Sequence, residues 1–124
     1  ILRTNYALSA VFRGEPSTPE EVERRTRDYA TKRKSSQPVG ASAGCIFRNP
    51  EIGKAGQLID ASGLKEARVG AARVSGVHAN FILNEGGATA SDVLALVEHV
   101  RAEVLKKQGV RLETEVQILG EEAS

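Results

Sequence analysis

Apolar side chains recur at helical spacing between Thr89 and Gly109, which makes this segment the clearest element of the sequence. Thr89 and Asp92 are spaced as the two partners of an N-terminal capping box, and Gly109 is typical of a helix C-terminus. The pattern therefore predicts one helix with a single buried side. The residues expected on that side are Val93, Leu94, Leu96, Val97, Val100, Val104 and Leu105.

A second helix is predicted over the segment PEEVERRTRDYATKRK. Thr18 suits the N-cap, Pro19 suits the first helical position, and Glu21 suits the reciprocal side of a capping box. Apolar residues are few, so only a thin stripe is expected to be buried. That stripe consists of Val22, Thr26, Tyr29 and Ala30.

A shorter helix is predicted in AGQLIDASG, residues 55–63, with Leu58 and Ile59 facing inward and Gly63 ending it. The segment SSQPVGASAG, residues 35–44, is rich in Ser, Gly and Pro, and this composition predicts a loop.

Strands are predicted from short apolar or alternating runs. They are residues 5–12, with Tyr6, Leu8, Ala10 and Phe12 on one face, then 45–47, 67–70 and 80–84, and one or two strands within 110–120. The strands and helices do not alternate regularly, so the expected fold class is α+β, with a small mixed or antiparallel sheet and flanking helices.

Composition adds limits to this picture. The chain has 124 residues, enough for one modest core. Its net charge of +1 argues against nucleic acid or an anionic membrane as a partner. One cysteine cannot form an internal disulfide, which favours a reducing, cytoplasmic location. No membrane span is expected from the sequence. The chain begins at Ile1 without a methionine, and we expect it to be a piece of a longer protein.

The only cysteine raises the main question about chemistry. Cys45 lies in GASAGCIFRNP, where Gly40 and Gly44 would let the backbone approach a ligand closely. The residues alone allow two interpretations, a buried core cysteine or a reactive thiol at the mouth of a site. His78 and His99 are too scattered to form a metal site with it, and His99 is expected on a helix surface. Asn80 and Glu115 are polar residues beside strands, where a structural or solvated role is the ordinary expectation.

Several long motifs occur together, in order. They are SAGCIFRNP, AGQLIDASGLKEARVGAARVSGVHANFILN and TASDVLALVEHVRAEVLKKQGVRLETEVQILG. Together they resemble the C-terminal, substrate-binding domain of the UDP-N-acetylenolpyruvoylglucosamine reductase family, from about Gln37 to Gly120. The resemblance implies three parts: residues 1–17 end a preceding FAD-binding domain, residues 18–36 form a linking helix, and residues 37–124 form the substrate-binding domain.

The resemblance also implies an activity. Enzymes of this family pass a hydride from NADPH to FAD and then to UDP-N-acetylglucosamine enolpyruvate, which yields UDP-N-acetylmuramate for peptidoglycan. The FAD would be bound by the domain that this chain lacks, so the chain alone is expected to be inactive. The implied partners are the enolpyruvyl substrate and the FAD-binding domain of the same protein, and no metal is implied.

Residue roles follow from the same resemblance. Cys45 stands where the family usually has a proton-donating serine, and Glu115 matches a glutamate that polarises the substrate carboxylate. Asn49, Lys34 and Arg48 match positions near the diphosphate and sugar. Two further positions depart from the family pattern, since Gln117 replaces a usual arginine and Ala71 a usual glycine. The alternatives are a non-catalytic UDP-sugar-binding module and an α+β interaction domain related only by ancestry.

Overall fold

A computed structural model describes residue 6 and residues 8–120. The chain divides into two compact units, residues 1–32 and 33–124. The described residues form helices and a four-stranded antiparallel sheet, which confirms the predicted α+β class. None of the helices in these residues is long and apolar enough to cross a membrane.

Helix α1 spans Pro19–Ser36 and begins as predicted, with Thr18 Oγ1 accepting a hydrogen bond from Glu21 N at 3.3 Å. The Glu21 carboxylate pairs with Arg24 and Arg25, although we expected it to return to the cap. The predicted buried stripe is wrong, because α1 has no buried residue and both Val22 and Tyr29 are exposed. Ion pairs three and four residues apart support the helix where apolar packing does not.

The predicted strand over residues 5–12 is wrong for the part that the structure describes. Residue 6 and residues 8–12 are in no strand, and the side chains of Tyr6, Leu8 and Phe12 are exposed. Residues 5 and 7 lie outside the described residues. An alternating pattern forms a strand only beside a partner that completes its hydrogen-bond ladder.

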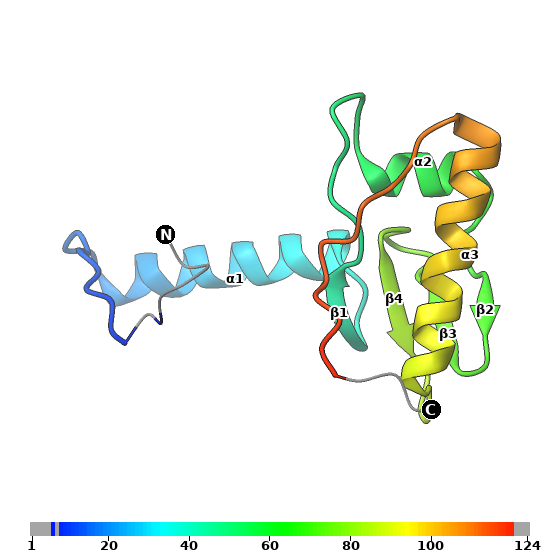
Figure 1. The fold of residues 1–124 in the computed structure, drawn as a ribbon. Helices are drawn as coiled ribbons and strands as arrows, with labels where there is room; N and C mark the ends of the chain where they lie inside the picture. The colour runs from blue at the N-terminus through cyan, green and yellow to red at the C-terminus, as the bar shows by residue number, and fades with distance from the viewer. Residues whose placement is uncertain (1–5, 7, 121–124) are drawn as a thin grey trace. The chain divides into compact units, whose positions relative to one another are not determined.

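The sheet lies within the unit of residues 33–124 and has the strand order β1-β4-β3-β2, all antiparallel (Figure 1). The strands are short, and their bounds are Ala41–Cys45 for β1, Arg68–Val69 for β2, Ala72–Val74 for β3 and Phe81–Asn84 for β4. Residues 67–70 and 80–84 were predicted as strands, and β2 and β4 confirm them. Three-residue β3 was not predicted, because it is too short for an alternating pattern to be visible.

Strand β1 occupies residues 41–44 of the segment 35–44 that was predicted as a loop. Ala41 pairs with Asn84 and Cys45 with Phe81, and the register is irregular between Ser42 and Cys45. Gly44 lies in this irregular stretch with φ +82°, a conformation that glycine adopts readily. The prediction of a loop failed because Ser, Gly and Pro mark bulged and edge strands as well as turns.

The C-terminal segment runs beside the end of β1 and the residues after it. A single bridge joins Phe47 and Thr114, and the described part of residues 110–120 forms no other strand pairing. The predicted one or two strands are therefore corrected to an extended segment. Ile118 and Leu119 are exposed, so the apolar end of this segment has no buried side that would stabilise its pairing with another strand.

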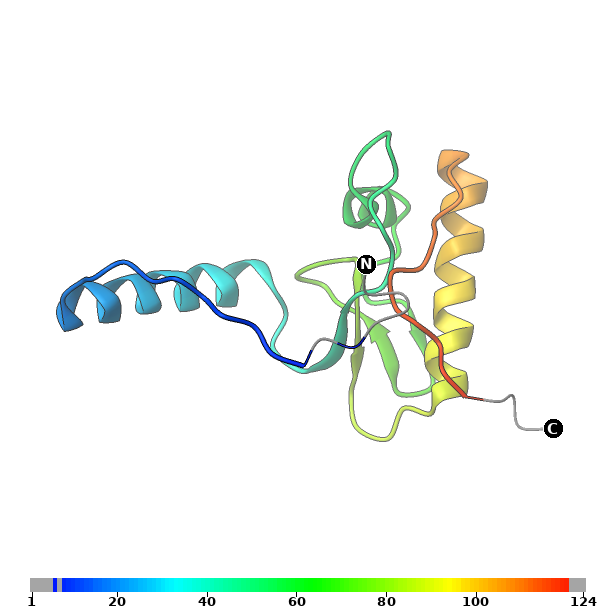
Figure 2. The same cartoon turned by 60° about the vertical axis from the view of Figure 1, so that its left-hand side comes forward.

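Two helices pack on this unit. Helix α2 spans Ala55–Ala61 and has Ile59 fully buried and Leu58 partly buried, as predicted, with Gly63 at φ +72° after it. Helix α3 spans Ala90–Gln108 and lies along the sheet in both ribbon views (Figures 1 and 2). The Thr89 capping box and the left-handed Gly109 are confirmed.

The buried side of α3 is narrower than predicted, because Leu94 and Leu105 are exposed and Val93 is partly buried. Its buried residues join those of the sheet, α2 and the extended segments in one core, formed by Ile46, Phe47, Ala55, Ile59, Leu64, Ala72, Val74, Ala79, Ile82, Leu96, Val97, Val100, Val104 and Leu112.

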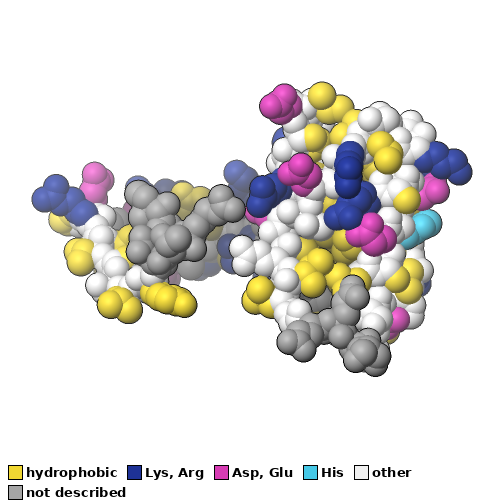
Figure 3. All heavy atoms as spheres, in the orientation of Figure 1, with side chains coloured by type: hydrophobic (Ala, Val, Ile, Leu, Met, Phe, Trp, Pro, Cys, Tyr) yellow, Lys and Arg dark blue, Asp and Glu magenta, His cyan; other side chains and the backbone are white. Residues whose placement is uncertain are grey.

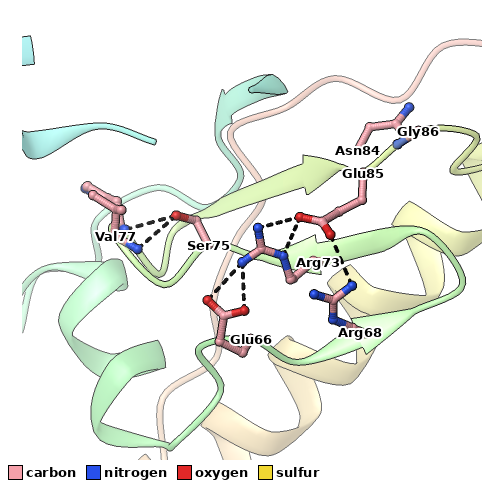
Figure 4. Close-up of polar contacts among 9 residues, drawn as sticks. Glu66, Arg68, Arg73, Ser75, Val77, Asn84, Glu85 and Gly86 are labelled. Atoms are coloured by element: carbon pink, nitrogen blue, oxygen red, sulfur yellow. Dashed lines mark hydrogen bonds and ion pairs between the residues drawn. The ribbon is translucent and has the colours of Figure 1, made fainter. Parts of the chain in front are cut away.

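The outer side of the sheet carries an ion-pair network centred on Arg73 of β3 (Figure 4). Its guanidinium bonds both oxygens of Glu66, at 2.9 and 2.7 Å, and its Nε bonds Glu85 at 2.6 Å. Arg68 of β2 reaches the same Glu85 carboxylate at 3.2 Å. These contacts join β2, β3 and the end of β4. On the face shown in Figure 3, positive and negative side chains are interspersed, in keeping with the net charge of +1.

Candidate functional site

An open cleft of about 400 Å³ lies beside Cys45, where the end of β1, the start of α2 and the loop before β4 meet. It is lined by Cys45, Asn49, Lys54, Gly56, Gln57, Asp60, Lys65, Val77, His78, Ala79 and Asn80. A cleft of this size with several convergent polar groups is typical of a small-molecule site.

Cys45 is half-buried, with a free thiol. Burial raises the pKa of this thiol, the nearby Glu115 carboxylate raises it further, and the Asn80 side-chain amide lowers it in part. The net direction is upward, so the thiol holds its proton through neutral pH. A protonated thiol at a cleft can donate a proton, whereas a nucleophilic thiolate would need the opposite shift.

Asn80 is buried immediately before β4, and its side-chain amide bonds the backbone of Phe47, two residues after Cys45. Its Oδ1 accepts from Phe47 N at 2.9 Å, and its Nδ2 donates to Phe47 O at 2.8 Å. Its own carbonyl oxygen accepts from Ile46 N at 2.9 Å. The structural role expected for Asn80 is confirmed, and the amide also lines the cleft.

The turn of residues 75–78 is fixed by the buried Ser75, and its residues Val77 and His78 line the cleft. Ser75 Oγ accepts from Val77 N at 3.1 Å and from His78 N at 3.2 Å (Figure 4). His78 Nδ1 in turn accepts from Asn80 N at 3.2 Å, and His78 also lines the cleft. Gly56 faces this ring, and a Cβ there would lie 3.1 Å from His78 Cε1. A glycine is therefore suited to this position of α2.

Asn49 reaches the cleft from the loop that leads to α2. Its Oδ1 accepts from Ala55 N at 3.0 Å, which satisfies an N–H group of the first helical turn. Lys54, the N-cap residue of α2, makes no side-chain cap hydrogen bond. Asn49 therefore ties the loop to α2 in addition to any contact with a ligand.

Glu115 comes from the extended C-terminal segment and is exposed. Its N–H donates to Ile46 O at 2.7 Å, one residue from Cys45, and its charge acts on the Cys45 thiol. The structure therefore brings together the two residues for which the sequence predicts catalytic roles. Neither the spacing of 70 positions nor the composition around Glu115 indicates this proximity without the resemblance.

A second cleft, of about 320 Å³, adjoins the first at Asn49. It is lined by Arg48, Asn49, Pro50, Glu51, Arg111 and Glu113. The N–H of Arg48 donates to Glu113 O at 2.8 Å, so the backbone of this wall is fixed by the same strand pairing that carries Glu115. Arg48 and Arg111 place two guanidinium groups at this cleft, where they could bind an anion.

Lys34 lies in the last turn of α1 and is exposed. It lines neither of the two clefts, and its role near the substrate stays a prediction.

The sequence reasoning missed part of the cleft wall. Lys54, Gln57, Asp60 and Lys65 line it, and Lys65 Nζ pairs with Asp60 Oδ2 at 2.7 Å. The sequence contained one signal for three of these residues: Lys54, Gln57 and Asp60 are the polar residues of KAGQLID, the stretch that begins the predicted short helix. In the structure they line the same cleft as Cys45. Among the described residues, no group of three or more His, Cys, Asp or Glu side chains could hold a metal ion.

Comparisons with known proteins agree with one another. The family model for the C-terminal domain of UDP-N-acetylenolpyruvoylglucosamine reductase matches residues 35–119. A reductase of that name from Geobacter metallireducens is 47% identical over 116 residues, which cover 93% of this chain and 39% of the relative. Another from Alkalilimnicola ehrlichii is 47% identical over 120 residues, which cover 96% of this chain and 40% of the relative.

A solved structure supports the same relationship. The crystal structure of UDP-N-acetylenolpyruvylglucosamine reductase from Thermus caldophilus matches with a TM-score of 0.68 and 44% sequence identity. The match covers 83% of this chain and 36% of the solved one. The chain thus spans about two fifths of the length of the two curated relatives described.

Proposed function

Because the chain belongs to the UDP-N-acetylenolpyruvoylglucosamine reductase family, we propose that it is the substrate-binding domain of a complete enzyme of that activity. The reaction would reduce the enolpyruvyl group of UDP-N-acetylglucosamine enolpyruvate and form UDP-N-acetylmuramate. As a step in making peptidoglycan precursors, it would take place in the cytoplasm. NADPH would be the source of the hydride.

The two long helices of this chain do not offer a site for FAD at their N-termini. A helix N-terminus with free N–H groups is a common site for the diphosphate of a dinucleotide. At α3, the Thr89 side chain accepts from Asp92 N, and the Asp92 carboxylate accepts from Thr89 N. At α1, Thr18 occupies the N–H of Glu21, and the first turn is acidic. The flavin would therefore bind in a part of the enzyme outside this chain and supply the hydride there.

The role of Cys45 in this proposal is proton transfer. Once a hydride has added to one carbon of the substrate double bond, the carbon next to the carboxylate carries an enolate electron pair. The Cys45 S–H bond would break, its proton would bond to that carbon, and the thiolate would regain a proton from solvent. The raised thiol pKa supports this role, because it keeps the donor form populated at neutral pH.

Glu115 would act on the same end of the substrate, beside its carboxylate or enol form. Asn49 would bind the sugar or diphosphate from its place between the two clefts. Arg48 would contribute a cation at the second cleft. Lys34, which lines neither cleft, would approach the substrate from α1. Positively charged and amide groups are suited to a diphosphate, because they donate several charge-assisted hydrogen bonds.

One observation carries the proposal: Cys45 lines an open cleft that several polar side chains also line, and the charge of Glu115 acts on its thiol. The test is substrate-dependent NADPH oxidation by the complete protein, purified with its flavin. We expect oxidation that requires the enolpyruvyl nucleotide. Tight binding of that nucleotide with no oxidation would instead favour a non-catalytic UDP-sugar-binding module, and no binding would favour an interaction domain.

A further inference from the structure

Glu66 has a backbone conformation that glycine adopts more readily than any other residue. Its φ is +67°, and in the described parts of the chain it is the one non-glycine residue with positive φ. Pairing with β3 holds it there, since Glu66 N donates to Val74 O at 3.1 Å and Val74 N donates to Ala67 O at 2.9 Å. A strained residue persists only where its surroundings fix it, and such residues cluster at functional sites.

Arg73 fixes the Glu66 carboxylate in one place. Its Nη1 donates to Oε1 of Glu66 at 2.9 Å and to Oε2 at 2.7 Å. Figure 4 shows Glu66 and Glu85 on either side of this guanidinium. The Arg73 side chain is only 19% exposed, so solvent and salt screen the ion pair less than they screen a pair between two fully exposed side chains. The Glu66 carboxylate therefore has a defined position.

That position lies directly against Gly76. A Cβ on Gly76 would collide with Glu66 Oε1 and would lie 3.4 Å from its Cδ, and the three atoms nearest to such a Cβ all belong to Glu66. Gly76 is not among the glycines with positive φ, so its backbone conformation is one that alanine also adopts. The carboxylate of Glu66 thus fills the space that a side chain at residue 76 would otherwise occupy.

Gly76 belongs to the turn that forms one wall of the first cleft. Ser75 Oγ accepts from Val77 N and from His78 N, and Phe81 N donates to His78 O at 3.0 Å, which closes the turn. Val77 and His78 line the cleft. Because Gly76 directly precedes Val77, a displacement of Gly76 moves this wall. The ion pair of Glu66 is therefore joined to the cleft through a single residue.

We propose that Glu66 is a positioning residue for the substrate: held by Arg73, its carboxylate supports Gly76 and thereby places Val77 and His78 in the cleft wall. This inference rests on the proposed function, in which the cleft takes the substrate. Glu66 does not line the cleft itself, so it acts through the turn. Affinity depends on the placement of the groups that contact a ligand, so the loss of this support weakens binding.

Glu85 provides a matched comparison within the same ion-pair network. It accepts from Arg73 Nε at 2.6 Å and from Arg68 at 3.2 Å, but it is not among the residues nearest to Gly76. If the network only joined the strands, removal of Glu85 would have the same effect as removal of Glu66. A difference between the two variants therefore reports the contact with Gly76.

The first experiment measures hydrogen exchange in the complete enzyme, by mass spectrometry of peptic peptides that cover residues 75–80. The N–H groups of Val77 and His78, which are bonded to Ser75 Oγ, report the turn. Glu66→Ala keeps a Cβ and with it the strain at residue 66, and exchange of these amides should become about fivefold faster or more. In Glu85→Ala their exchange should equal that of the unchanged enzyme. Equal exchange in the two variants overturns the inference.

The second experiment is a double-mutant cycle between residues 66 and 76, measured by isothermal titration with the enolpyruvyl nucleotide. Glu66→Ala should weaken binding roughly five- to tenfold because the turn loses its support. Gly76→Ala should weaken it to a similar extent, because the methyl group and the carboxylate cannot share one space. In the double variant the methyl group fills the space that the carboxylate leaves, so the dissociation constant should return to within about threefold of the original value. Losses that simply multiply overturn the inference.

Two further measurements separate positioning from a general loss of structure. Reduction of the flavin by NADPH should be the same in every variant, and a variant that is slow in this half-reaction as well contradicts a role confined to the substrate cleft. Glu66→Gln keeps the bulk against Gly76 and an oxygen for Arg73, so it should bind the nucleotide almost as well as the unchanged enzyme. If Gly76→Ala does not fold, this comparison decides, and equal weakening in Glu66→Ala and Glu66→Gln overturns the inference.

These outcomes distinguish the inference from the function on which it rests. If the unchanged complete enzyme does not bind the enolpyruvyl nucleotide, the proposed function is wrong, and hydrogen exchange still decides whether Glu66 supports the turn. If the unchanged enzyme binds the nucleotide and Glu66→Ala binds it equally well, the proposed function stands and Glu66 has no part in it.

Discussion

The Glu115 carboxylate lies close enough to the Cys45 thiol to raise the thiol pKa, adding to the larger effect of burial. The two residues are 70 positions apart and are held together by backbone pairing, with Glu115 N donating to Ile46 O at 2.7 Å. The bridge between Phe47 and Thr114 fixes the register of this pairing. A carboxylate and a thiol are thereby placed at one end of a cleft by a segment that forms no extended strand.

The first prediction tests that relationship through Glu115→Gln in the complete enzyme. Removing the charge should lower the Cys45 pKa, so alkylation of Cys45 at a fixed mildly alkaline pH should become faster. Oxidation of the reduced flavin by substrate should slow, while reduction of the flavin by NADPH should be nearly unchanged. Rapid mixing separates the two half-reactions.

Glu98→Gln is a suitable control, because Glu98 is on α3 and pairs there with Arg101. It should change neither half-reaction. A Glu115→Gln enzyme whose defect lies only in the NADPH half-reaction would contradict the assignment of Glu115 to the substrate.

The second prediction concerns pH. Burial and Glu115 raise the folded-state pKa of Cys45, so the thiol stays protonated through neutral pH and loses its proton only as the pH rises through that raised value. Single-turnover product formation should therefore be flat near neutrality and fall on the alkaline side. In Cys45→Ser this alkaline limb should vanish, since a serine hydroxyl does not ionise there. An identical limb in both enzymes would assign it to another group.

Asn49 needs a variant that separates its two roles. Asn49→Asp keeps an oxygen that can accept from Ala55 N, so α2 should remain tied to its loop. The carboxylate loses the N–H donors and repels a diphosphate. Substrate binding should weaken by about 1.5–3 kcal/mol, with a smaller effect on the chemical step. Isothermal titration with the substrate measures this, and an unchanged dissociation constant would remove Asn49 from the site.

A further prediction links the β2–β3 turn to the cap of α3. A Cβ on Gly70 would lie 2.5 Å from Asp92 Cγ, and Asp92 Oδ2 accepts from Thr89 N at 2.9 Å. Gly70→Ala should therefore disturb this cap, at a cost of roughly 1 kcal/mol in addition to the backbone strain. Hydrogen exchange in the first turn of α3 should become faster.

Gly86→Ala is the matched control for Gly70→Ala. Gly86 also has positive φ, +104°, but a Cβ there would meet no atom within 4 Å. It should incur the backbone strain alone and leave exchange at the start of α3 unchanged. Equal exchange in the two variants would show that Asp92 yields to the added methyl group.

Much of the fold was predictable from local signals. The Thr89 cap and Gly109 delimit α3, and β4 is visible as a short apolar run, because these features depend on neighbours a few residues away. The failures involve distant partners. Residues 8–12 alternate but have no ladder partner in the described chain, and β1 forms from a glycine-rich segment because β4 pairs with it.

The candidate site was predictable only through the family resemblance. Composition and spacing left Cys45 open to a core role, and nothing local joins it to Glu115. The hydrogen bonds of Asn80 to Phe47 and the wall residues Lys54 and Lys65 depend on how α2 and the loop before β4 meet the end of β1. Contacts of this kind arise from tertiary packing, which no single stretch of sequence encodes.

The most direct test of the account is a single turnover in deuterated solvent with the complete enzyme, comparing Cys45 with Cys45→Ser and Cys45→Ala. Product formation and the deuterium content of the carbon next to the carboxylate are measured together. The account predicts substantial product formation in Cys45→Ser and a loss of about 10²-fold or more in Cys45→Ala. Normal product formation with full deuterium incorporation in Cys45→Ala would contradict it and leave the thiol a packing residue.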